Sequence, residues 1–141
     1  MTSNPRTIVV PKASQVLYDH YHFAPATRVG DTVWVSGQVG VDARGRPGDG
    51  IAAQAELAFE SLKAVLAEAG ASLGDVVELT TFHIDLRGDM QAFGAVKDRY
   101  FPSHYPSWTA VGTTALAVEG LLVEVRAVAV VGSAPAQTDP A

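Results

Sequence analysis

The feature that most constrains the fold is the apolar run LLVEVRAVAVV at residues 121–131. Every position in it is apolar except Glu124 and Arg126, so both sides of the predicted strand carry apolar residues. A strand that is apolar on both faces is covered on both faces. A chain of 141 residues has few elements with which to cover it twice. We therefore expect helices over one face of this strand and another subunit over the other.

Two earlier segments have clear local patterns. Residues 26–42 read as a hairpin, in which Gly30 and Asp31 supply a two-residue turn between β-prone runs. Apolar residues at spacings of three and four predict a helix over residues 51–69. Gly70 follows at the position where a left-handed residue commonly closes a helix.

The second half of the chain predicts further strands around one helix. Residues 75–86 are rich in β-branched residues and predict a strand. Asp89 is expected to cap a second helix of about ten residues, which Pro102 ends. Another strand is expected over residues 108–116. This order predicts an α+β sheet with two helices on one face.

Composition excludes several classes of function. Fifteen acidic residues against ten basic ones give a formal net charge of −5, which disfavours binding to nucleic acids and anionic membranes. The absence of cysteine excludes disulfides, thiolate nucleophiles and Cys-ligated zinc. The sequence shows neither a signal-peptide pattern nor an apolar run long enough to span a bilayer, so we expect a cytoplasmic protein.

The chain is expected to form a single domain over residues 1–141, because no linker or repeat divides it. The core is expected at about residues 7–132. The ends, residues 1–6 and 133–141, are rich in Pro, Ser, Ala and Thr and are expected to be poorly ordered tails.

Glu124 is the charged residue that most suggests chemistry. It interrupts a strand of valines, leucines and alanines. Burial raises the pKa of a carboxyl group toward the range that is useful in acid–base catalysis. The alternative is that Glu124 and Arg126 lie on a solvated face and pair with each other.

Other candidate motifs carry less information. In a strand, the side chains of His20 and His22 would point to the same side and could form a pair of metal ligands. The spacing identifies no third ligand, so no metal is expected. The glycines of SGQVG, residues 36–40, permit close approach of a ligand or another chain. Ser36 lacks the G-x-S-x-G setting of a hydrolase nucleophile.

Several segments together resemble the RidA/YjgF/YER057c/UK114 superfamily, over roughly residues 22–131. The resemblance rests on VGDTVWVSGQVGVD, on Gln54 in the predicted helix, on AGASLGDVV after it, and on YPSWTAVGTTAL followed by LLVEVRAVAV. It implies a chorismate-mutase-like α+β fold, a six-stranded mixed sheet backed by two helices, and a homotrimer whose sheets form a central barrel. It also implies a small-molecule ligand between subunits, with enamine or imine deamination as the best-known activity and no cofactor or metal.

The resemblance assigns site roles to seven positions. In the deaminating members, an arginine in P-x-R binds the substrate carboxylate, and a glutamate in the last strand acts on water or relays protons. Glu124 matches that catalytic glutamate, but Trp108 occupies the arginine position, and an indole has one N–H and no charge. The other ligand-binding positions are Ser36 and Gly37, which match the family, Phe23 in place of a tyrosine, Lys97 at a frequent asparagine, and Arg126 at a frequent acid.

Three functions are compatible with these residues. The first is a deaminase or related hydrolase, for which standard 2-imino acids are disfavoured because Trp108 cannot pair with their carboxylate. The second is a non-catalytic trimer that binds a small ligand or regulates a partner, with Phe23, Trp108 and Glu124 lining one pocket for an apolar or cationic molecule. The third is an endoribonuclease, which the charge of −5 disfavours.

Overall fold

The apolar C-terminal run forms β6 (Val123–Val130), which lies between β3 (Thr32–Val39) and β4 (Val76–His83) inside a six-stranded sheet. The computed structural model describes residues 5–136. The strand order is β1-β2-β3-β6-β4-β5, with β4 and β5 parallel and the other described pairs antiparallel. The predicted mixed α+β sheet is confirmed. Its remaining strands are β1 (Thr7–Val9), β2 (Ala26–Val29) and β5 (Ser107–Gly112).

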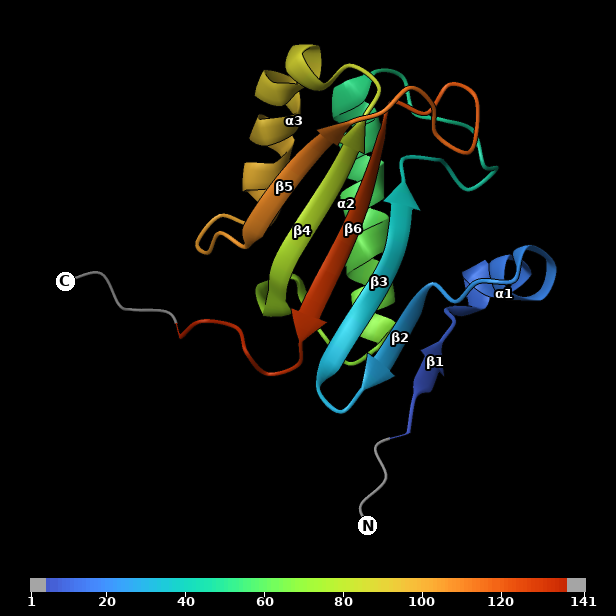
Figure 1. Ribbon diagram of the computed structural model, residues 1–141, viewed down its shortest axis with the longest axis vertical. Coiled ribbons are helices and arrows are strands. Elements are labelled where there is room, and N and C mark those ends of the chain that lie inside the picture. The colour runs from blue at the N-terminus through green and yellow to red at the C-terminus, as the bar shows by residue number, and fades with distance from the viewer. Residues whose placement is uncertain (1–4, 137–141) are drawn as a thin grey trace.

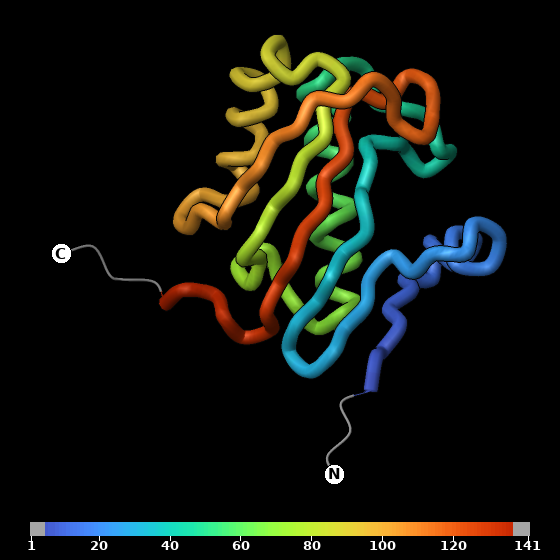
Figure 2. Tube along the Cα trace, in the orientation of Figure 1, coloured from blue at the N-terminus to red at the C-terminus, as the bar shows by residue number. Residues whose placement is uncertain are grey.

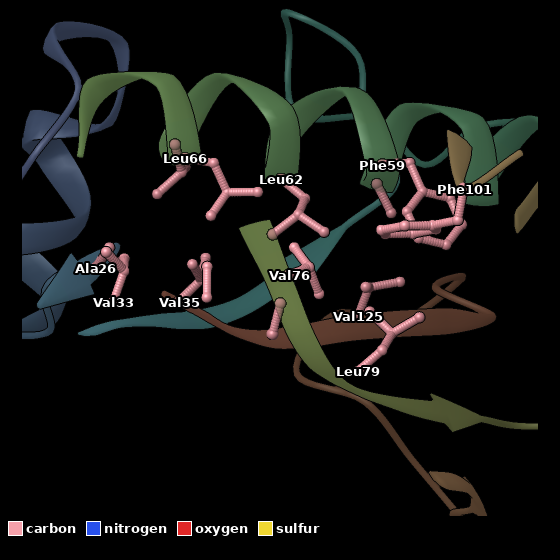
Figure 3. Close-up of a cluster of buried hydrophobic side chains, with 14 of the residues drawn as sticks. Ala26, Val33, Val35, Phe59, Leu62, Leu66, Val76, Leu79, Phe101 and Val125 are labelled. Atoms are coloured by element: carbon pink, nitrogen blue, oxygen red, sulfur yellow. The ribbon is translucent and has the colours of Figure 1, made fainter. Parts of the chain in front are cut away.

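Two helices, α2 (Ile51–Glu68) and α3 (Leu86–Tyr100), cover one face of the sheet (Figure 1). Side chains of α2 pack onto the inward residues of the central strands (Figure 3). Figure 3 labels Phe59, Leu62 and Leu66 on α2, which face labelled strand residues that include Val35, Val76 and Val125. The predicted helix and its closing glycine are confirmed, because α2 ends at Glu68 and Gly70 has φ +83°.

The second helix begins earlier than expected. Asp85 is its N-cap, and the Asp85 carboxylate accepts a hydrogen bond from the Gly88 N–H, so the prediction that Asp89 caps this helix is wrong. Asp89 lies in the first turn and is buried. The helix has 15 residues rather than about ten, because its true cap lies four positions upstream.

The N-terminal part of the chain lies at the β1 end of the sheet (Figure 2). It contains η1 (Lys12–Ser14) and α1 (Gln15–Tyr21), and a further 3₁₀ turn, η2 (Leu73–Asp75), precedes β4. His20 is in α1 and His22 closes that helix with φ +59°, so the strand arrangement considered for this pair does not form. Among residues 5–136, no helix is both long enough and apolar enough to cross a membrane.

Gln54 on α2 fixes the loops at one end of the sheet. Its side-chain NH₂ donates to the carbonyls of Gly48 and Gly120, and its Oε1 accepts from the Leu122 N–H at 2.7 Å. Gly40 lies against the backbone of Gln54, and any Cβ at residue 40 would collide with it. The last glycine of SGQVG therefore serves a contact within the chain. These contacts hold the start of β6 just before Glu124.

Candidate functional site

The register of the sheet places Glu124 on the face that the helices leave open. Val123 and Val125 are fully buried toward the helices, so Glu124 between them points the other way. Its strand neighbours are Val39 on β3 and Phe82 on β4. The viewer of Figure 1 looks onto this open face, with α2 behind the central strands.

Glu124 lies directly against Gly37. The pairing of β3 with β6 shifts between Val35 and Gln38, which is a β-bulge that contains Gly37. A Cβ at residue 37 would lie 2.5 Å from the Glu124 carboxyl carbon, so any residue other than glycine would displace this carboxyl group. Within the described part of the chain, the carboxyl group has no hydrogen-bond or ion-pair partner, and burial raises its pKa above the ordinary value for glutamate.

Arg126 shares the open face with Glu124 but does not pair with it. It is exposed, and it lies opposite Thr80 of β4. Over residues 5–136 there is no salt bridge between the two side chains, and the raised pKa of Glu124 has burial as its cause, without a contribution from a nearby cation. The alternative of a simple surface ion pair between residues 124 and 126 is therefore wrong for this chain.

Ser36 connects the bulge to the segment that carries Phe23. The Ser36 hydroxyl donates to the Ala24 carbonyl at 2.6 Å, and the Ser36 N–H donates to the Pro25 carbonyl at 2.9 Å. Phe23, one residue earlier, is 40% exposed. The structure thus brings the Phe23 segment, Ser36, Gly37 and Glu124 into one region of the molecule.

Trp108 belongs to a different region, on the helix side of the sheet. It pairs with Leu79 of the parallel strand β4, and Leu79 is fully buried in the core under the helices. Its indole N–H donates to Thr81 Oγ1 at 3.0 Å, and its ring lies 6.0 Å from that of Phe93 on α3. Trp108 as a whole residue is nevertheless 38% exposed at the sheet edge.

Lys97 of α3 lies over the Trp108 ring. Its ammonium nitrogen is 4.7 Å from the ring centroid, which is a cation–π distance, and 3.6 Å from an Asp98 carboxylate oxygen. The Lys97 side chain is only 9% exposed. The structure therefore brings Lys97 and Trp108 together.

Glu124 and Trp108 do not share a pocket within one chain. They point to opposite faces of the sheet, and β4 separates their strands. A pocket lined by Phe23, Trp108 and Glu124 of the same chain is therefore ruled out. Across the described residues, no cluster of three or more His, Asp or Glu side chains is arranged to hold a metal ion.

Comparison with known proteins identifies the family. The family model described as Endoribonuclease L-PSP matches residues 14–131. The chain belongs to the RidA/YjgF/YER057c/UK114 superfamily. The RutC family protein YjgH of Escherichia coli is 39% identical over 125 residues, covering 88% of this chain and 94% of the relative. A 2-iminobutanoate/2-iminopropanoate deaminase of Dermatophagoides farinae is 32% identical over 131 residues, covering 92% and 98%.

Solved RidA-family structures agree with this fold. Protein YJGH superposes with a TM-score of 0.81 at 38% identity, covering 94% of this chain and 98% of the other. Rv2704 of Mycobacterium tuberculosis, a member of the YjgF/YER057c/UK114 family, has a TM-score of 0.79 at 33% identity and covers 90% and 100%. The fold and family expected from the sequence are confirmed.

Three polar residues lie behind Trp108 in this RidA-family chain, and the sequence did not predict that they form a hydrogen-bonded group. Thr81 Oγ1 also lies 2.8 Å from His83 Nε2, and His83 Nδ1 lies 3.2 Å from Asp89 Oδ2. Thr81 and His83 are fully buried, and Asp89 is 7% exposed. Their spacing was a usable signal, because Thr81 and His83 alternate with Leu79 and so face the core.

Proposed function

We propose that this RidA-family chain forms a homotrimer in which the Glu124 region of one subunit meets the Trp108 edge of the next. Since the two residues lie on opposite faces of the sheet, one ligand can touch both only if two copies contribute. The open face also carries Trp34 and Val111, which are 41% and 38% exposed. Burying such side chains against another copy is favourable.

The proposed activity is hydrolysis of a small imine or enamine, with Glu124 as the general base and acid. The carboxylate takes a proton from water as the oxygen bonds to the imine carbon, and the nitrogen is protonated. The C–N bond then breaks, so that R₂C=NH and H₂O give R₂C=O and NH₃. The observation that carries this proposal is the half-buried Glu124 carboxyl group, which lies over Gly37 and has no partner in the described chain.

The proposed substrate lacks a carboxylate. Several relatives are named 2-iminobutanoate/2-iminopropanoate deaminases, whose named substrates are 2-imino acids. In this chain Trp108 offers no charge, and its N–H is already bonded to Thr81. The Lys97 ammonium beside it is largely buried and already lies against the ring and the Asp98 carboxylate. A substrate carboxylate buried without a partner costs roughly several kcal/mol. The proposal therefore retains imine hydrolysis and replaces the acid substrate, with no cofactor or metal.

The test measures ammonia release from imines generated in the assay. We expect acceleration with a carboxylate-free imine, little with 2-iminopropanoate, and none with either in Glu124→Ala. A gain on 2-iminopropanoate in Trp108→Arg would place the substrate preference at this residue. No acceleration of any imine by the wild-type chain would overturn the enzymatic proposal.

A non-catalytic ligand-binding trimer is the second candidate. The observation that favours it is the exposed Trp108 ring, which offers a stacking surface without any reactive group. A cationic ligand is disfavoured there, because the Lys97 ammonium already lies over the ring. An endoribonuclease is disfavoured by the net charge of −5.

A further inference from the structure

A continuous row of hydrogen bonds runs under α3 from Trp108 through Thr81 and His83 to Asp89. In this order the residues resemble a hydrolytic Asp-His-Thr triad. Thr81 is fully buried and its hydroxyl is already bonded to Trp108, so no substrate reaches it. The row therefore serves another purpose than nucleophilic attack.

The chemistry of each group fixes the direction of every bond. An indole N–H can only donate, so Thr81 Oγ1 accepts from Trp108. The Thr81 hydroxyl proton is then available to His83 Nε2, which must be unprotonated to accept it. His83 therefore carries its proton on Nδ1 and donates it to Asp89. All four side chains are satisfied when His83 is neutral.

Protonation of His83 would break this order. Its Nε2–H would then donate to Thr81, and the Thr81 hydroxyl proton would lose its acceptor. Burial lowers the pKa of His83 more than Asp89 raises it, which agrees with a neutral ring. The charged groups that act on the row are Asp89 and Lys97 on α3 and Asp85 at its N-cap, whose charge raises the pKa of Asp89.

We propose that Thr81, His83 and Asp89 are positioning residues that hold Trp108 as a fixed, non-donating wall, which selects a planar ligand without a carboxylate. The inference about the ligand rests on the proposed function, in which Trp108 lines the cleft. With its N–H turned inward, the indole presents only carbon atoms at the sheet edge. A flat group stacks on such a surface, whereas an anion finds no donor on the indole itself. The neighbouring Lys97 ammonium is largely buried between the ring and the Asp98 carboxylate.

The first experiment tests, without any ligand, whether the row of hydrogen bonds fixes the Trp108 indole. In ¹⁵N NMR spectra of the wild-type chain at neutral pH, His83 is expected as the Nδ1–H tautomer. Observation of the Nε2–H tautomer or of an imidazolium would contradict the proposed row of hydrogen bonds. The Trp108 indole N–H is expected to exchange at least about tenfold more slowly in the wild-type chain than in Thr81→Val, which removes its acceptor. Thr81→Val should remove this protection and Thr81→Ser should keep it. Equal exchange of the Trp108 indole N–H in the wild type and in Thr81→Val would contradict the proposal.

The second experiment tests the selection with two matched probes. Isothermal titration calorimetry of the wild-type chain measures the binding of benzamide and of benzoate. We expect benzamide to bind at least about tenfold more tightly than benzoate, and Trp108→Arg to reverse this order. Equal binding of both probes, or binding of neither, would overturn the selection. The tautomer of His83 still decides the positioning role if the imine assay fails.

Discussion

The two faces of the sheet treat their polar groups in opposite ways. Under α3, each polar group in the row of hydrogen bonds from Trp108 to Asp89 has a partner. On the open face, Glu124 is half-buried against Gly37 without one in the described chain. Partnered groups are fixed, while an unpartnered carboxyl group keeps its capacity to exchange protons. This difference separates the residue proposed to react from those proposed to shape the ligand.

The largest expected effect is the loss of activity in Glu124→Gln. An amide keeps the size of the side chain but cannot take a proton from water, so ammonia release from a carboxylate-free imine should fall by about 100-fold or more. The matched control is Glu78→Gln, an exposed carboxylate on β4, for which the rate should not change. Equal losses in both variants would contradict the role of Glu124.

The row of hydrogen bonds under α3 is tested by removing the Thr81 hydroxyl. Thr81→Val leaves the buried Trp108 N–H and His83 Nε2 without a partner, so the free energy of unfolding should fall by about 2–4 kcal/mol. Thr80→Val, on the other face of the same strand, should change it by less than about 0.5 kcal/mol. Urea denaturation measures both, and similar values would remove the distinction between the faces.

A smaller effect is expected at Gly37 on the open face, with Gly94 of α3 as the control. A Cβ at residue 37 must displace the Glu124 carboxyl group, so Gly37→Ala should lower ammonia release by about tenfold. At Gly94 in α3 a Cβ meets open space, so Gly94→Ala should leave the rate unchanged and add up to about 1 kcal/mol of stability. An unaffected rate in Gly37→Ala would show that the position of the carboxyl group is not critical.

The smallest expected effect is the pH dependence of stability at Glu124. Its folded-state pKa is raised by burial, so its contribution is fully favourable in acid and is lost as pH rises through that pKa. Glu124→Gln should therefore be more stable than wild type near neutral pH, and this advantage should vanish below the unfolded pKa of glutamate. Thermal unfolding across this range measures the difference, and a constant offset would show that Glu124 is not desolvated.

Patterns of residues close together in the sequence predicted much of this fold. The arrangement of the site depends instead on how strands distant in sequence pair with one another. The turn at Gly30, the helix α2 and the central apolar strand follow from residues close together in the sequence. The N-cap of α3 was wrongly assigned to Asp89, because Asp85 and Asp89 both precede apolar-periodic residues and only their hydrogen bonds distinguish them. The structure also contains β1 and α1, which no strong pattern marks.

The site was predicted as a list of residues rather than as an arrangement. Glu124 stands out in the sequence because it interrupts an apolar strand. The side of the sheet on which Trp108 lies depends on its parallel pairing with Leu79, a contact between distant segments. The row of hydrogen bonds also depends on the pairing of β4 with β5, since it joins these two strands to α3.

Sedimentation equilibrium at micromolar concentration tests the central claim most directly, because a ligand site that uses both faces of the sheet requires more than one copy of the chain. We predict a mass of about 44 kDa, three times the chain mass of 14.8 kDa. A species of 14.8 kDa that still releases ammonia from an imine would contradict the shared site.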